Sequence, residues 1–287
     1  MGTPQNILKR GKKMNIKKLL CLVLCLFIAL GSLVACGGNN DDNGGNPETP
    51  SDFYSEAKKS LENTSYVETW TEKRTAVDSE GNPIEDFMLP NTVDTIVFEV
   101  NGKNFKTSYV YGDISVDNFC VDGIFYDTTE KKKAPYSDTD LLTIAANLGF
   151  NADNTGINSY EKVTVESGKD GGHIVKGTGT SEATLATLNA IMQQVSAGAA
   201  EEGIGLSFEF SPDKSFCEIV FDKDNRVVSS KNSSVFTISV VAEGQTFSGT
   251  YKLEESFTYD YKDVTVTLPN DVGTYETCES FMDLILG

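Results

Sequence analysis

Few residues of this chain combine the types and spacing that catalysis or metal binding requires. The single histidine, His173, falls in a predicted strand, and we interpret it as a strand-edge residue. The sequence contains no G-x-S-x-G, H-E-x-x-H or C-x-x-C motif, so it gives no support to a serine hydrolase or a transition-metal site. Acidic pairs are common in a chain with 42 aspartates and glutamates, so none of them alone indicates a glycosidase. We expect a protein that is not an enzyme, with no cofactor and no metal.

The segment Asn151–Gly156 comes nearest to a metal-binding motif. It resembles the first half of a calcium-binding loop, but Lys162 stands at the twelfth position, where such a loop carries a bidentate glutamate. We therefore interpret the segment as a turn rich in asparagine and aspartate.

Three cysteines, Cys120, Cys217 and Cys278, remain once the amino-terminal segment is set aside. They allow one disulfide in any of three pairings, with one thiol left over. All three lie among apolar residues, so buried free thiols are the other interpretation.

The last long stretch of the chain, residues 226–262, alternates in polarity. Apolar or aromatic side chains occupy most even positions from 228 to 240 and most odd positions from 247 to 261. A period of two predicts two long strands, paired antiparallel through a two-residue turn at Glu243-Gly244. The register pairs Val240 with Phe247, Ile238 with Gly249, Phe236 with Tyr251, Ser234 with Leu253, Asn232 with Glu255, Ser230 with Phe257 and Val228 with Tyr259.

The pairing of Asn232 with Glu255 has two interpretations. On the functional one, the two polar groups lie in an apolar concavity and orient the head group of a ligand. On the other, the long hairpin reaches solvent or bulges at this point, and both side chains are solvated.

The rest of the folded region alternates predicted helices with antiparallel strands. The helices are expected at 51–61 (with Ser51 or Asp52 as N-cap), 137–148, 181–195 and 275–286, and the strands at 65–77, 161–166, 173–177, 204–210, 216–221 and 264–268. A meander covers 92–129, and Glu130–Lys133 is a charged turn. Turns at Asn101-Gly102, Gly112-Asp113 and Asp122-Gly123 pair Phe98 with Phe105, Tyr111 with Ile114, Tyr109 with Val116, Phe105 with Cys120 and Cys120 with Phe125.

The expected helix at 181–195 carries an apolar stripe, formed by Leu185, Leu188, Met192 and Val195. A long hairpin with one apolar face must twist and be covered. This helix is a natural cover for that face.

The composition is that of a globular protein: 287 residues, 39% hydrophobic, with a formal net charge of −18. Six of the 24 basic residues and no acidic residue precede Cys36, so the chain from Cys36 onward carries a net charge of −24. Such a surface argues against nucleic acid as a partner and against direct adsorption to anionic lipid.

The amino terminus has the pattern of an export signal. Four lysines at 12, 13, 17 and 18 precede an apolar run, Leu19–Leu30, which is short for a membrane span. The following Leu33-Val34-Ala35-Cys36 resembles the lipobox of bacterial lipoproteins. The resemblance implies a signal peptide at 1–35, starting at Met1 or Met14, and a diacylglycerol thioether on Cys36, whose acyl chains anchor the protein to the membrane. Residues 36–50 then form the lipidated cysteine and a flexible linker of small and polar residues.

The order of these features resembles the LolA/LppX-type lipoprotein superfamily. It comprises the lipobox, the linker, a first helix, a long strand, a meander with the Val121–Tyr126 hairpin, covering helices and a long terminal hairpin. The resemblance implies an α+β fold for a single domain at 51–287. A large curved antiparallel sheet forms a half-barrel, with helices covering its concave face. It also implies that a lipid or lipid-like molecule is carried in that cavity.

We therefore predict a lipoprotein anchored to the extracytoplasmic face of a bacterial cell membrane. It binds a hydrophobic or amphipathic molecule between the sheet and the helices. The alternative is a cell-surface structural or interaction lipoprotein with a packed core and no ligand, which a cavity under roughly 300 Å³ would favour. The residues expected to line the ligand site are Asn232, Phe236, Ile238, Phe247, Tyr251, Leu253, Glu255, Phe257, Leu185 and Met192.

Overall fold

The structure, a computed structural model, describes residues 49–84, 92–111, 114–137, 156–201, 203, 205–242 and 245–286. The predicted signal peptide, Cys36 and most of the linker lie outside the described residues. So do most of the predicted 137–148 helix and the 151–155 part of the calcium-like loop. Within the described part, no helix is both long and apolar enough to cross a membrane.

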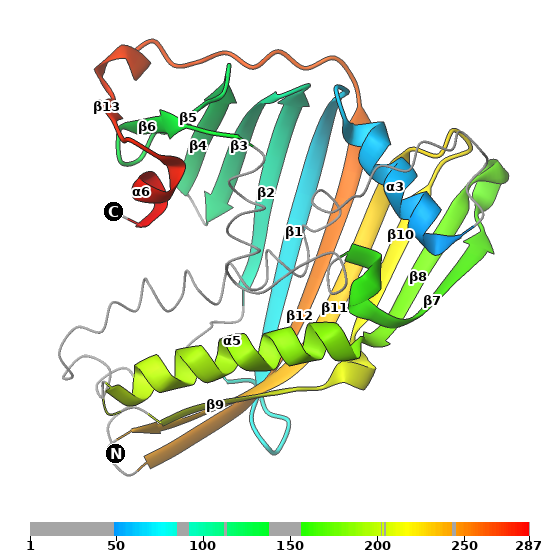
Figure 1. Cartoon of the computed structure of the whole chain (residues 1–287), viewed down its shortest axis with the longest axis vertical. Helices are drawn as coiled ribbons and strands as arrows, with labels where there is room; N and C mark the ends of the chain where they lie inside the picture. Colours follow the sequence, from blue (N-terminus) through cyan, green and yellow to red (C-terminus); the bar gives the residue numbers. More distant parts are fainter. Residues whose placement is uncertain are drawn as a thin grey trace.

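The described residues form one open sheet of thirteen strands, with three α-helices beside it (Figure 1). The expected large, mainly antiparallel sheet is confirmed, and only the pair β6–β13 is parallel. Twelve strands follow the order β13-β6-β5-β4-β3-β2-β1-β12-β11-β10-β8-β7, and β9 pairs with β11 beyond the end of β10. The strands are β1 Ser65–Val77, β2 Thr92–Asn101, β3 Asn104–Tyr111, β4 Ile114–Val121, β5 Ile124–Asp127, β6 Lys132–Pro135, β7 Tyr160–Ser167, β8 His173–Thr180, β9 Gly205–Phe210, β10 Phe216–Phe221, β11 Val227–Ala242, β12 Gln245–Tyr261 and β13 Glu276–Thr277.

The hairpin β11–β12 has the register that the alternating pattern predicts. Asn232 pairs with Glu255, Phe236 with Tyr251, and Ala242 with Gln245 beside the turn. The other predicted pairs from Val240–Phe247 to Ser230–Phe257 are also present without a register shift. The predicted pair of Val228 with Tyr259 is not formed, because the pairing ends at Ser229–Thr258. On its other side β12 pairs with β1 over twelve residues, so β12 is central to the sheet.

The meander β2–β5 follows its predicted turns except at the first. Tyr111–Ile114, Tyr109–Val116, Phe105–Cys120 and Cys120–Phe125 pair as expected. The predicted pair of Phe98 with Phe105 is wrong, because Phe105 faces Val100 instead. The turn is centred on Gly102-Lys103 and Gly102 has a φ of +59°, which suits the first central position of a type II′ turn. The register therefore moves by two residues, and the apolar side chains keep their face.

Two helices pack on the same side of the sheet, which we call the inner face. Helix α3, Pro50–Leu61, is the helix expected at 51–61, and it buries Phe53 and Ala57. Its N-cap is Thr49 rather than Ser51 or Asp52, because the Thr49 hydroxyl accepts from the Asp52 amide while the Asp52 carboxylate accepts from the Thr49 amide. This reciprocal pair resembles a capping box.

Helix α5, Glu182–Glu201, is six residues longer than predicted at its carboxyl end. The Ser181 hydroxyl accepts a hydrogen bond from the Thr184 amide at its start. The end at Val195 was wrong because the segment that follows is rich in alanine and buries Ala199 against the sheet. The stripe residues Leu188, Met192 and Val195 pack in one cluster with side chains from β9, β11 and β12.

The carboxyl-terminal segment differs most from the prediction. The expected strand at 264–268 is absent from the described structure. Val266 and Leu268 run as an extended coil that packs on Phe119 and Tyr126, which point away from the inner face because neighbouring residues of a strand alternate in direction. Strands β6 and β13 form where a charged turn and a helix start were predicted, and helix α6 covers only Phe281–Leu286.

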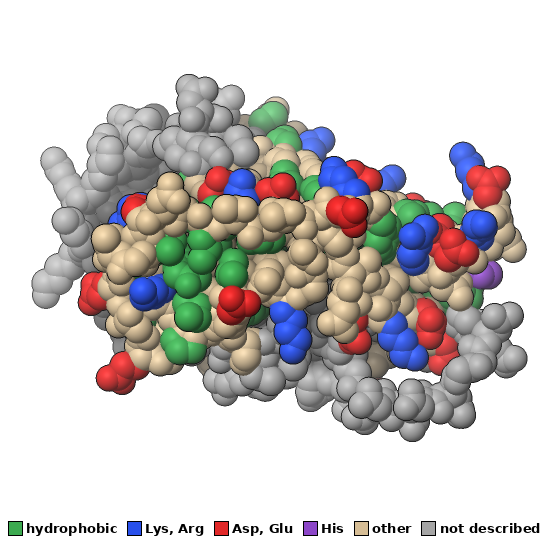
Figure 2. All heavy atoms as spheres, turned by 90° about the horizontal axis from the view of Figure 1, so that it is seen from above, with side chains coloured by type: hydrophobic (Ala, Val, Ile, Leu, Met, Phe, Trp, Pro, Cys, Tyr) green, Lys and Arg blue, Asp and Glu red, His purple; other side chains and the backbone are tan. Residues whose placement is uncertain are grey.

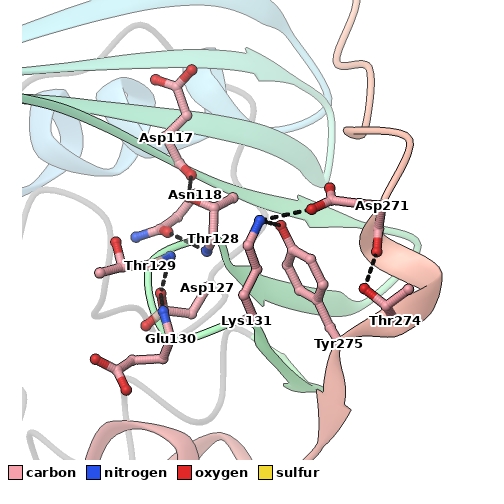
Figure 3. A network of polar contacts seen from close by, with 10 residues as sticks. All are labelled: Asp117, Asn118, Asp127, Thr128, Thr129, Glu130, Lys131, Asp271, Thr274 and Tyr275. Atoms are coloured by element: carbon pink, nitrogen blue, oxygen red, sulfur yellow. Dashed lines mark hydrogen bonds and ion pairs between the residues drawn. The ribbon is translucent and has the colours of Figure 1, made fainter.

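A small polar network fastens this coil to the turn between β5 and β6 (Figure 3). The Lys131 ammonium donates to Asp271 at 2.7 Å and to the Tyr275 hydroxyl at 3.2 Å. The Thr274 hydroxyl donates to the backbone carbonyl of Asp271 at 2.8 Å. These contacts are exposed or half-buried, so we interpret the network as one that holds the segment before β13 against the β5–β6 turn.

Candidate functional site

A row of polar side chains crosses the inner face at the middle of the sheet. Asp94 on β2, Glu72 on β1, Glu255 on β12 and Asn232 on β11 are successive pairing partners across four strands. The three acidic residues are only 7%, 8% and 5% exposed. We call these four residues the acid row. Burying three carboxyl groups side by side is costly unless each finds a partner.

Arg74 provides a partner for two of the three carboxyl groups. Its Nε lies 2.7 Å from Oε1 of Glu72, and its guanidinium also forms an ion pair with Asp94. Among the described residues Glu255 forms no ion pair. The row therefore contains three acids against one cation.

The protonation of Glu255 reflects this imbalance. Burial, reinforced by the neighbouring carboxylate of Glu72, raises its pKa to about 8. A hydrogen bond with Asn232 and the nearby indole of Trp70 act in the opposite direction and are outweighed. Burial likewise raises the pKa of Glu72, although Arg74 opposes the shift. At neutral pH Glu255 therefore holds its proton in most molecules.

Within the part of the chain that the structure describes, several polar atoms around Glu255 are buried without a satisfactory hydrogen bond. They are Oε1 of Glu255, Oγ of Ser230 and Nε1 of Trp70, which is near the carboxyl group but outside hydrogen-bond geometry. Buried polar atoms of this kind are rare in folded proteins. Their clustering marks the acid row as more than a packing feature.

Aromatic pairs flank the row on both sides along the strands. Trp70 stacks on Phe257 with ring centroids 5.8 Å apart and planes 5° apart. Phe236 stacks on Tyr251 at 5.5 Å and 12°. The acid row is thus a polar strip enclosed by aromatic surface, an arrangement that suits an amphipathic ligand.

A small pocket opens beside the row, between the amino-terminal end of α5 and residues of β7, β8, β9, β11 and β12. Its volume is about 40 Å³. That is room for a few water molecules or one small polar group, and far below the size of an ordinary small-molecule site. Seven of its twelve lining residues carry a hydroxyl group. The lining consists of Ser159, Tyr160, Thr180, Thr184, Leu188, Phe210, Ser215, Asn232, Ser233, Ser234, Leu253 and Glu255.

The structure divides the predicted ligand residues into three groups. Asn232, Leu253 and Glu255 line the pocket. Phe236, Ile238, Tyr251 and Met192 are packed in the cluster between α5 and the sheet, and Phe257 lies under Trp70. Leu185 is half-buried on α5. Phe247 pairs with Val240, but its side chain lies outside the described residues. The predicted lipidation site, Cys36, also lies outside them.

The solvated interpretation of Asn232 and Glu255 is wrong. Glu255 is buried, and neither strand bulges at this pair. Sequence reasoning missed the other members of the site, Glu72, Asp94 and Arg74. Their alternation along β1 and β2 was a usable signal for their face, but the pairing of β1 with β12 was not expected from the pattern.

His173, Cys120 and Cys278 lie away from the acid row, whereas Cys217 on β10 is the pairing partner of Asn232 at the end of the row. His173 begins β8 and its ring packs 4.7 Å from that of Phe53. The three cysteines are free thiols, and Cys120 and Cys217 are buried, which agrees with the second interpretation above. Burial raises the pKa of Cys217 to about 11, so this thiol is not a nucleophile at neutral pH.

No protein-family model matches this sequence, and no curated protein is significantly similar to it. We therefore infer function from the acid row and its pocket. These provide a buried acid without a cationic partner among the described residues, beside a small cavity lined by several hydroxyl groups.

Proposed function

We propose that this protein is a lipoprotein of the extracytoplasmic membrane face that binds an amphipathic molecule at the acid row. The observation that carries this proposal is the surplus of buried acid: three carboxyl groups, one guanidinium, and an unpartnered oxygen of Glu255 beside a pocket. Apolar side chains at such positions would stabilise a core as much as these charged groups do, or more. A ligand that completes the polar contacts explains why these groups are buried.

The packing of the helices on the sheet supports the incomplete barrel that this function needs. Helix α5 shares one hydrophobic cluster with β9, β11 and β12, and α3 shares another with β8, β10 and β11. We propose that they close one side of an incomplete barrel, as in the LolA/LppX-type superfamily. The head group of the ligand enters the pocket, and its apolar part lies along the aromatic inner face.

The anchor follows from the lipobox-like Leu33-Val34-Ala35-Cys36. Two acyl chains on Cys36 hold the domain at the membrane, where a single chain would dissociate readily. We expect Cys36→Ala to move the protein out of the membrane fraction and to prevent incorporation of radiolabelled palmitate in cells. Labelling that persists in Cys36→Ala would contradict the anchor, and Cys25→Ala is a matched control that should leave it unchanged.

Binding is tested by native mass spectrometry of the processed protein after expression in several bacterial hosts. A bound amphipathic molecule is expected in the native protein and in Glu254→Gln. It is expected to be lost or strongly depleted in Glu255→Gln. Protein that is empty from every host would count against the ligand.

A second function, docking of a protein partner by a fully packed lipoprotein, is favoured by the small pocket volume of about 40 Å³. Figure 2 also shows an apolar patch between acidic and basic side chains on the face it displays, and such patches occur at interaction sites. In-cell crosslinking that recovers one protein reproducibly, together with ligand-free native spectra, would support this alternative.

A further inference from the structure

We propose that the ligand's head group is a protonated primary amine, which the pocket binds through the ionised carboxylate of Glu255. This inference rests on the proposed ligand-binding function and names the chemistry of the ligand. It starts from charge. With all three acids of the row ionised, one guanidinium leaves two negative charges unbalanced in the row, and Arg74 is already occupied by Glu72 and Asp94.

The geometry of the pocket fits an ammonium group. Glu255 lines the pocket, is 5% exposed, and has an Oε1 without a hydrogen-bond partner. An ammonium has three N–H donors and no acceptor. A carboxylate oxygen and the hydroxyl oxygens of the lining, such as that of Ser234, are the acceptors that such a group needs.

Other cations fit less well. A guanidinium with its chain is too bulky for a pocket of about 40 Å³, and a quaternary ammonium has no N–H to donate. A calcium ion takes six to eight oxygen ligands, several of them carboxylates. Among the described residues, no three His, Cys, Asp or Glu side chains gather closely enough to hold a metal ion.

Binding of an amine is then coupled to release of a proton. In the empty pocket Glu255 is mostly protonated, since burial raises its pKa to about 8. The charged group that acts on it is Glu72 from β1, which in turn contacts Arg74 from β1 and has Asp94 from β2 nearby, whereas the pocket residues from α5, Thr184 and Leu188, are uncharged. When the ammonium binds, the Glu255 O–H bond breaks, its proton leaves to solvent, and the ion pair replaces it.

The size of this coupling follows from the pKa. At pH 7 about nine tenths of the Glu255 side chains hold a proton, and at pH 9 about one tenth do. We therefore expect about 0.9 proton released per amine bound at pH 7 and about 0.1 at pH 9. The affinity should rise up to about tenfold between the two.

The test is isothermal titration calorimetry of the full-length protein in detergent, in buffers of different ionisation enthalpy, with ethylammonium as the probe and glycerol as the neutral polar comparison. Ethylammonium should bind with a Kd of about 1–10 mM, a range set by its few atoms, with the proton release given above. Glu255→Gln should weaken binding at least tenfold and abolish the proton release. Glu254→Gln, one residue away on the opposite face, should change neither. The folding of each variant is checked by the emission of Trp70, the only tryptophan of the chain.

The outcomes separate this inference from the proposed function. If glycerol binds as tightly as ethylammonium and Glu255→Gln changes nothing, the amine is refuted and a polar ligand remains. A co-purified molecule without an amine also refutes it and leaves the proposed function intact. If neither probe binds up to 50 mM and native spectra show empty protein, both the amine and the proposed ligand-binding function are refuted.

Discussion

Replacing Glu255 by glutamine should stabilise the protein at neutral pH, against the usual effect of a substitution in a core. Burial and the Glu72 carboxylate raise the folded-state pKa of Glu255 from 4.5 to about 8. Below pH 4.5 the carboxyl is protonated in both the folded and the unfolded state and costs nothing. Between pH 4.5 and 8 the unfolded state loses its proton first, so the free energy of unfolding falls by about 1.4 kcal/mol per pH unit. Above pH 8 the cost levels off on the order of 5 kcal/mol.

Glutamine has nearly the shape of glutamate and never ionises, so Glu255→Gln escapes this cost. Relative to the native protein, the variant should gain roughly 1 kcal/mol at pH 5 and roughly 3 kcal/mol at pH 7. Any change in hydrogen bonding by the new amide adds a constant that does not depend on pH. The difference in free energy of unfolding between the two proteins should therefore grow with pH, whatever its value at pH 5.

The assay is urea unfolding at each pH from 5 to 9, followed by the emission of Trp70. Trp70 lies beside Glu255 and is the only tryptophan in the sequence, so it reports on this part of the sheet. Glu254→Gln provides the matched control, because Glu254 is on the other face and contacts Lys73 and Lys252 in exposed ion pairs. A difference for Glu255→Gln that stays constant between pH 5 and 8 would refute the reasoning, because it would show that the carboxyl titrates normally.

Four further substitutions test stability and are measured by urea unfolding at one pH. Gly177→Ala should destabilise the protein by about 1–3 kcal/mol, because the new Cβ would lie 2.5 Å from a tyrosine ring of β7. Gly198→Ala, in α5 with nothing within 4 Å of the new Cβ, should instead stabilise it by about 0.5–1 kcal/mol, and the reverse order of the two would contradict the packing described here. Arg74→Ala should cost about 3–5 kcal/mol by leaving two buried carboxyls without a cation, whereas a loss equal to that of the exposed Lys73→Ala would show that the pair is not needed. Thr49→Ala should cost about 1 kcal/mol if Thr49 caps α3, and no change would place the cap elsewhere.

The sequence by itself determined the local architecture around Asn232 and Glu255. Because side chains alternate along a strand and a two-residue turn allows few registers, the pattern from 228 to 261 specified which residues of β11 and β12 face each other. The same logic placed four of the five meander pairs. It failed at Phe98, where two turn centres around Asn101-Gly102 keep the same faces and cannot be distinguished by polarity.

Only the tertiary structure decided that this pair belongs to a larger site. Glu72 and Glu255 are pairing partners although they lie 183 positions apart in the sequence. No turn links their strands, so no local rule sets that contact. The pairing of β1 with β12 and β2 brings the carboxyls of Glu72 and Asp94 beside Glu255, with Arg74 balancing two of them. Burial by distant parts of the chain then turns an exposed-looking glutamate into an acid that holds its proton at neutral pH.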